Sequence, residues 1–157
     1  MTTAAAVALS ALVAGTLDIT ATGSLMRAQG VPFPRLMQGV ASGAIGGAAF
    51  EGGAGTAAFG LLLHYCIAST WAVIYWILVH PWPALFSRPL LIGATYGVVV
   101  HLVMSGIVLP LSRLRRPFSW NAWLMQIPIH MFCVGIPIAW IQSHALQNHA
   151  LQSYVLR

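Results

Sequence analysis

Charge is the scarcest property of this sequence. Only 6% of its 157 residues are Asp, Glu, Lys or Arg, whereas soluble domains carry about 25%. Asp18 and Glu51 are the two acids, and the seven basic side chains are all Arg, so the sequence contains no Lys. Because 59% of the residues are hydrophobic, this balance excludes an ordinary soluble domain and indicates a polytopic membrane protein.

The missing charges also exclude function classes. There is no Gly-rich phosphate loop after a strand, no nucleophile elbow and no pair of neighbouring carboxylates. Two acids offer little for acid–base catalysis, so we expect no enzymatic activity of the chain alone. The basic side chains are confined to short connections instead of forming a soluble basic face, so we expect no nucleic-acid partner.

Four apolar windows are long enough to cross a hydrocarbon core, which takes about 20 residues of helix. Connections containing Pro and Arg separate them, and Pro just beyond a helical run stops the helix. The sequence therefore predicts a single-domain, all-α, polytopic four-helix bundle. Its spans are expected at about 5–26, 54–79, 89–111 and 121–143.

One apolar segment, 36–50, is too short to cross a membrane. Its glycines leave one side almost without side chains, which suits close contact with another helix. We expect an additional re-entrant or interfacial helix at 36–50. The alternative is that this segment extends the second span as one long tilted helix.

Arginine placement predicts the orientation. Cytoplasmic loops carry an excess of basic residues. The connections on one side of the four spans contain Arg27, Arg35, Arg113, Arg115 and Arg116, and the other side contains Arg88 and Arg157. The richer side is expected to be cytoplasmic, which places both termini outside the cytoplasm.

Ionisable residues near the middle of the spans mark a candidate site. Asp18, His64, His101 and His130 each lie within about one helical turn of the centre of their window. Ionisable groups at that depth are costly, and they usually face the bundle interior and indicate function.

Small residues share helix faces with these ionisable groups. Gly15, Gly60 and Gly97 lie one turn from Asp18, His64 and His101, and small residues let membrane helices approach closely. We therefore expect these three glycines to be helix-packing positions and the polar stripes to face inward.

The leading interpretation is a mid-membrane site that binds or conducts protons or a small polar ligand. Histidine titrates near neutrality, and a nearby carboxylate favours its charged form. Asp18, His64, His101 and His130 would form the site. Glu51, beside two glycines, could serve as a relay at the cytoplasmic mouth, or it could cap the second span.

Two alternatives stay open. The first is a haem b or metal-binding subunit of a redox complex. Two histidines from different helices can hold haem iron, with Gly60 and Gly97 clearing room for the macrocycle. His64, His101, His130 and Cys133 are the candidate ligands, and Cys133 lies one turn after His130, as a metal site could use. The second is a structural accessory subunit whose polar groups only join helices.

Two sequence segments carry a family resemblance. The first segment is Gly93-Ala94-Thr95-Tyr96-Gly97, followed by His101 and by Leu109-Pro110, and the second is Ala49-Phe50-Glu51-Gly52-Gly53 before His64. Both resemble the YagU-like group of uncharacterised bacterial four-helix inner-membrane proteins. The resemblance implies a bacterial inner-membrane location and no particular reaction. Because small bundles with Gly-rich faces commonly bury them against another chain, we expect a homo-oligomer or a membrane-complex partner besides the lipid bilayer.

Overall fold

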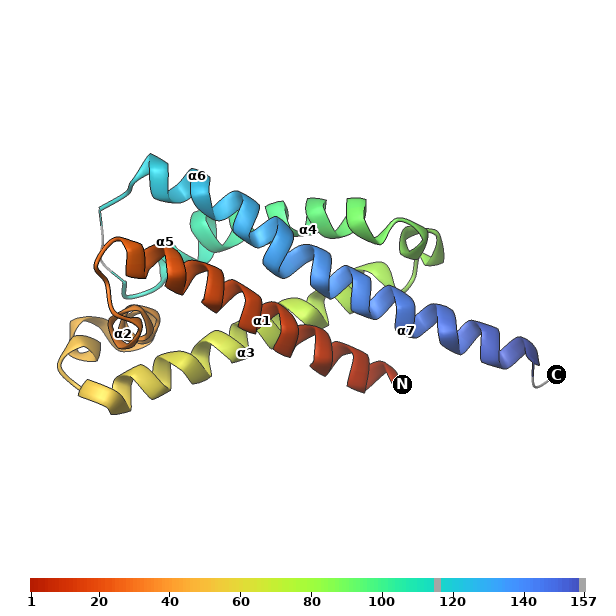
Figure 1. The fold of residues 1–157 in the computed structure, drawn as a ribbon, viewed down its shortest axis with the longest axis horizontal. Helices are drawn as coiled ribbons and strands as arrows, with labels where there is room; N and C mark the ends of the chain where they lie inside the picture. Colours follow the sequence, from red (N-terminus) through yellow and green to blue (C-terminus); the bar gives the residue numbers. More distant parts are fainter. Residues whose placement is uncertain (115–116, 156–157) are drawn as a thin grey trace.

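Four long helical rods make up the fold (Figure 1). The computed structural model describes residues 1–114 and 117–155, and these form helices and connections without a strand. The first rod is α1 (Thr3–Ala28), the second is α3 (Gly53–Val79), and the third joins α4 (Pro89–Val103), η3 (Met104–Val108) and α5 (Leu109–Leu111). The fourth joins α6 (Trp120–Ile129), η4 (His130–Gly135) and α7 (Ile136–Val155).

The predicted all-α four-helix fold is confirmed. Each rod is long and apolar enough to cross a membrane, over Thr3–Ala28, Gly53–Val79, Pro89–Leu111 and Trp120–Leu146. Large apolar side chains cover the outside of the bundle, for example Leu12, Leu62 and Ile77, each more than half exposed. Such a surface is stable in lipid and not in water. The chain is a multi-pass membrane protein.

The two ends of the bundle differ in composition. The start of α1 and the end of α7 lie at the end that also carries η2 (Pro83–Ser87) and Arg88, whereas α2 (Phe33–Ile45) and α5 lie at the opposite end (Figure 1). Arg27, Arg35 and Arg113 belong to that opposite end, which we call the arginine-rich end. Arg115, Arg116 and Arg157, on which the predicted orientation also rests, lie outside the described residues.

The segment between the first two spans forms a separate helix, α2 (Phe33–Ile45), followed by the short 3-10 helix η1 (Gly46–Phe50). Figure 1 shows α2 along its own axis while the rods cross the view, so α2 lies across the arginine-rich end. Gly46 (φ 71°) and Gly53 (φ 58°) break the chain direction in a conformation that favours glycine. The alternative of one long tilted helix is therefore wrong.

Polar contacts attach α2 to its neighbours. Gln38 Nε2 donates a hydrogen bond to the Gly53 carbonyl at 3.0 Å, and the Arg113 backbone N–H donates to the Gly43 carbonyl at 2.8 Å. Gly60 of α3 lies directly against the backbone of Met37, and a Cβ at this glycine would overlap the Met37 carbonyl. Small residues thus allow α2 to cross α3 in backbone contact.

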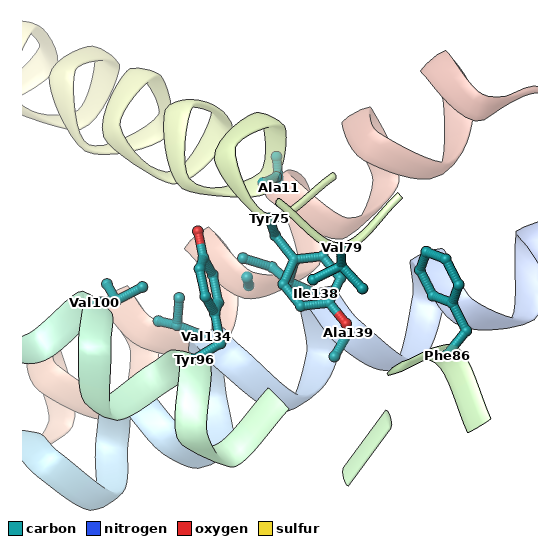
Figure 2. Packing of buried hydrophobic residues seen from close by; sticks show 11 residues of the cluster. Ala11, Tyr75, Val79, Phe86, Tyr96, Val100, Val134, Ile138 and Ala139 are labelled. Atoms are coloured by element: carbon teal, nitrogen blue, oxygen red, sulfur yellow. The ribbon is translucent and has the colours of Figure 1, made fainter. Parts of the chain in front are cut away.

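The half of the bundle nearer the termini is tightly packed (Figure 2). Tyr75 of α3, Val100 of α4 and Ile138 of α7 are almost completely buried there. The α4 helix and η4 also meet backbone to backbone, since a Cβ at Gly97 would overlap the His130 carbonyl and one at Gly135 would overlap the Gly93 carbonyl. This half therefore leaves no room for added atoms at the helix contacts.

Candidate functional site: a polar cavity between the spans

A cavity of about 640 Å³ occupies the half of the bundle nearer the arginine-rich end. Residues of α1, α2, α3, η3 and η4 line it, so every rod contributes to its wall and α2 covers one side. Most of the wall is apolar, including Leu36, Val40, Leu63, Ile67, Met104 and Val108. Asp18, His64 and His130 are the ionisable side chains in its wall besides Arg35.

These three groups come from three different rods and lie at a similar depth. Asp18, His64 and His130 are each within about 5 Å of the middle of their span, at a rise of 1.5 Å per residue. Asp18 interacts electrostatically with both histidines. The structure thus places three of the four predicted polar residues around one space.

Backbone carbonyls fix the orientation of both imidazole rings. His64 Nε2 lies 2.8 Å from the Gly15 carbonyl of α1, and His130 Nδ1 lies 2.8 Å from the Gln126 carbonyl one turn earlier. A carbonyl oxygen accepts hydrogen bonds and cannot donate them, so each of these nitrogens carries a proton. Asp18 Oδ1 is buried without a hydrogen-bond partner.

His101 occupies a different place. It does not line the cavity and is only 3% exposed. Its ring lies 5.2 Å from the His130 ring and 4.9 Å from the Trp123 ring, centroid to centroid, so it packs behind His130. Ser105 links this group, because it accepts from Trp123 Nε1 at 3.0 Å and donates to the His101 carbonyl at 2.7 Å. His101 Nε2 has no hydrogen-bond partner.

Two π-helical turns interrupt the rods beside the cavity. The turn η4 begins at His130 and is flanked by Pro128 and Pro137, and η3 contributes Met104 and Val108 to the wall. Proline removes a backbone donor from the helix, so the local hydrogen-bond pattern has to change. Such turns occur frequently at functional sites.

Two predicted residues lie elsewhere. Glu51 is exposed in the turn between η1 and α3 and does not line the cavity. Its position therefore offers no contact with Asp18. Cys133 is partly buried on η4 and interacts electrostatically with Asp18, but it too is outside the cavity wall.

The residues do not fit a haem or metal centre. Within the part of the chain that the structure describes, no three His, Cys, Asp or Glu side chains are close enough to hold a metal ion. The room expected for a macrocycle is filled, since α2 backbone occupies the space beside Gly60 and η4 backbone that beside Gly97. Gly15 likewise faces the Tyr65 ring, so all three glycines lie at helix contacts.

A second buried polar group was missed by sequence reasoning. Gln142 of α7 is 1% exposed, and its Nε2 donates to Ser10 Oγ of α1 and to the Ala72 carbonyl of α3, both at 3.0 Å. Gln142 gave no signal because it lies near the predicted end of its span, where polar residues are common.

The fold and the site together define the class: a multi-pass α-helical membrane protein with a mostly apolar internal cavity and an Asp/His polar group in its wall. No family model, functionally described protein or solved structure matches the chain. The YagU-like resemblance therefore stays a prediction.

Proposed function

We propose that this protein binds a small molecule in the cavity between its spans, with Asp18, His64 and His130 as polar anchors. The observation that carries the proposal is the cavity of about 640 Å³ with these three groups in an otherwise mostly apolar wall. Ligand sites in proteins typically have about this size and combine apolar walls with a few convergent polar groups. The ligand would be largely apolar and would carry one polar group.

Binding is better supported than conduction through the membrane. A conduction path needs polar or hydrated space on both sides of the central groups. From the cavity toward the termini, the interior contains the packed cluster around Tyr75, Val100 and Ile138, each less than 2% exposed. The cavity is thus closed toward that end, which favours a site that is loaded from the arginine-rich side or from the lipid.

For the location we propose the bacterial inner membrane, with the arginine-rich end in the cytoplasm. Arg27, Arg35 and Arg113 support this orientation because basic residues accumulate on the cytoplasmic side. Labelling single cysteines at Gly30 and at Ser87 in intact cells with a membrane-impermeant reagent tests it. We expect labelling at Ser87 only, and labelling at Gly30 instead would reverse the orientation. Assembly with a second copy or with another membrane protein stays a prediction.

The binding test uses two glycines that differ in their surroundings. A Cβ at Gly39 of α2 or at Gly55 of α3 would meet no atom within 4 Å, but only Gly39 lines the cavity. We expect Gly39→Phe to fill the cavity and Gly55→Phe to leave it open. The two variants should differ little in unfolding temperature, since a Cβ at either position meets no atom.

The probe is 4-phenylbutan-1-ol, a small apolar molecule with a hydroxyl group. Isothermal titration of the protein in lipid nanodiscs, corrected with empty nanodiscs, measures its binding. We expect saturable binding to the wild type and to Gly55→Phe, and at least a tenfold loss of affinity in Gly39→Phe. Equal heats from all three proteins and the empty nanodiscs would overturn the proposed function.

A further inference from the structure

We infer that the ligand is a lipophilic amine, whose protonated nitrogen donates hydrogen bonds to Asp18, His64 and His130 at the end of an apolar body. This inference rests on the proposed function and specifies the chemical class of the ligand. It follows from the hydrogen-bonding character of the three side chains, which all offer acceptors toward the cavity.

The two imidazole rings have one nitrogen each left for a ligand. His64 Nε2 and His130 Nδ1 carry protons because they face carbonyl oxygens. In a neutral imidazole the other nitrogen is then an acceptor. His64 Nδ1 and His130 Nε2 make no hydrogen bond within the described residues and are not among the buried polar atoms without a partner. Each ring therefore presents a lone pair beside the cavity.

Asp18 adds a third acceptor. An ionised carboxylate only accepts hydrogen bonds, and Asp18 Oδ2 makes no hydrogen bond within the described residues and, unlike Oδ1, is not among the fully buried polar atoms. A carboxylate ligand would bring two more acceptors and a like charge, which is unfavourable at low dielectric. An alcohol has one O–H, whereas a primary ammonium has three N–H donors and a compensating positive charge. The ammonium therefore has one N–H donor for each of the three groups and a charge opposite to that of the carboxylate.

The charged and titratable groups from the other elements do not change this preference. Arg35 of α2 lies at the rim, where its guanidinium sits 4.1 Å from the centre of the Phe50 ring and its Nη1 donates to the Phe50 carbonyl at 3.4 Å. These contacts hold the guanidinium at Phe50. Cys133 on η4 and His101 on α4 face Asp18 and His130 from outside the cavity wall.

The test compares four probes with the same phenylbutyl body: 4-phenylbutylamine, its N,N,N-trimethyl derivative, 4-phenylbutan-1-ol and 4-phenylbutyrate. Titration calorimetry in nanodiscs at pH 8 measures each affinity. We expect the primary amine to bind at least tenfold more tightly than the alcohol, and the carboxylate to bind most weakly. The trimethyl derivative keeps the charge but has no N–H, so we expect it to lose at least tenfold relative to the amine.

Variants assign the preference to the site. We expect Asp18→Asn to remove the tenfold advantage of amine over alcohol and His64→Gln to reduce it, while both proteins still bind the alcohol. Cys66→Ser serves as the control, because Cys66 is exposed on α3 and outside the cavity wall. If Asp18→Asn folds normally and still prefers the amine by the same factor, the inference is overturned.

The outcomes for the alcohol and the amine separate the inference from the proposed function. If the alcohol binds in a cavity-dependent manner but the amine binds no more tightly, the inference fails and the proposed function stands. If neither binds, both fail.

Discussion

The two halves of the bundle surround their buried polar groups differently. In the half nearer the termini, Gln142 Nε2 has two hydrogen bonds while Gln142 Oε1 has none, and packed side chains fill the space around both atoms. In the half under α2, Asp18, His64 and His130 line a cavity of about 640 Å³. Gln142 in the first half joins three helices, whereas the polar groups of the second half border a cavity. The packed half thus supports stability, and the cavity half is where we propose binding.

The largest effect should come from the backbone contact between α4 and η4. In Gly135→Leu the added side chain has to displace the backbone of Gly93 and Gly97, neither of which has a flexible group that could move. Overpacking usually costs about 1–3 kcal/mol, and a rigid neighbour raises the cost, so we expect little folded protein. Size-exclusion chromatography and thermal unfolding in detergent measure it. Gly55→Leu is the control, and equal behaviour of the two would contradict the packing described here.

An intermediate effect is expected at the polar contact of the packed half. Gln142→Ala removes both Nε2 hydrogen bonds and leaves a void among α1, α3 and α7. We expect a loss of about 2 kcal/mol in unfolding free energy, mostly from the void. Denaturation with sodium dodecyl sulfate, followed by circular dichroism, measures it. A loss no larger than that of Asp18→Asn would remove the distinction between the two halves.

The smallest stability effect should come from the cavity half. Asp18→Asn keeps the shape of the side chain and removes an ionisable group that lacks a partner at Oδ1. Because that group is costly inside a membrane, we expect the unfolding free energy to change by less than about 0.5 kcal/mol. The same denaturant titration at pH 7 measures it. A loss above 2 kcal/mol would make Asp18 a structural residue.

The spans could be predicted from the sequence because local features determine where each helix begins and ends. Apolar length and the flanking Pro and Arg residues predict where each span begins and ends, and the helices follow these windows closely. The direction of α2 was harder to predict, since positive φ values at Gly46 and Gly53 change the direction of the backbone between α2 and α3. A Gly-rich apolar segment is compatible with a break and with a continuous helix alike.

The depth of the ionisable residues in the membrane could be predicted, but the direction in which their side chains point could not. Asp18, His64, His101 and His130 lie near mid-span, as expected from counting residues. Whether an imidazole ring borders the cavity or packs behind another ring depends on the rotation of its helix about its axis. The rotation of α4 places His101 behind His130 and Trp123. The cavity itself arises because α2 lies across the rods, an arrangement that helical periodicity does not describe.

The turn η4 has a consequence for the register of the fourth rod. His130 and Gln142 are twelve positions apart, and a uniform α-helix, at about 100° per residue, would direct them about 120° apart. A π-turn absorbs about one extra residue, which reduces the difference to about 20°. Both side chains accordingly face α1, where Asp18 and Ser10 lie. Deleting one residue from η4 would restore regular α-helical hydrogen bonding there and turn either His130 or Gln142 away from α1.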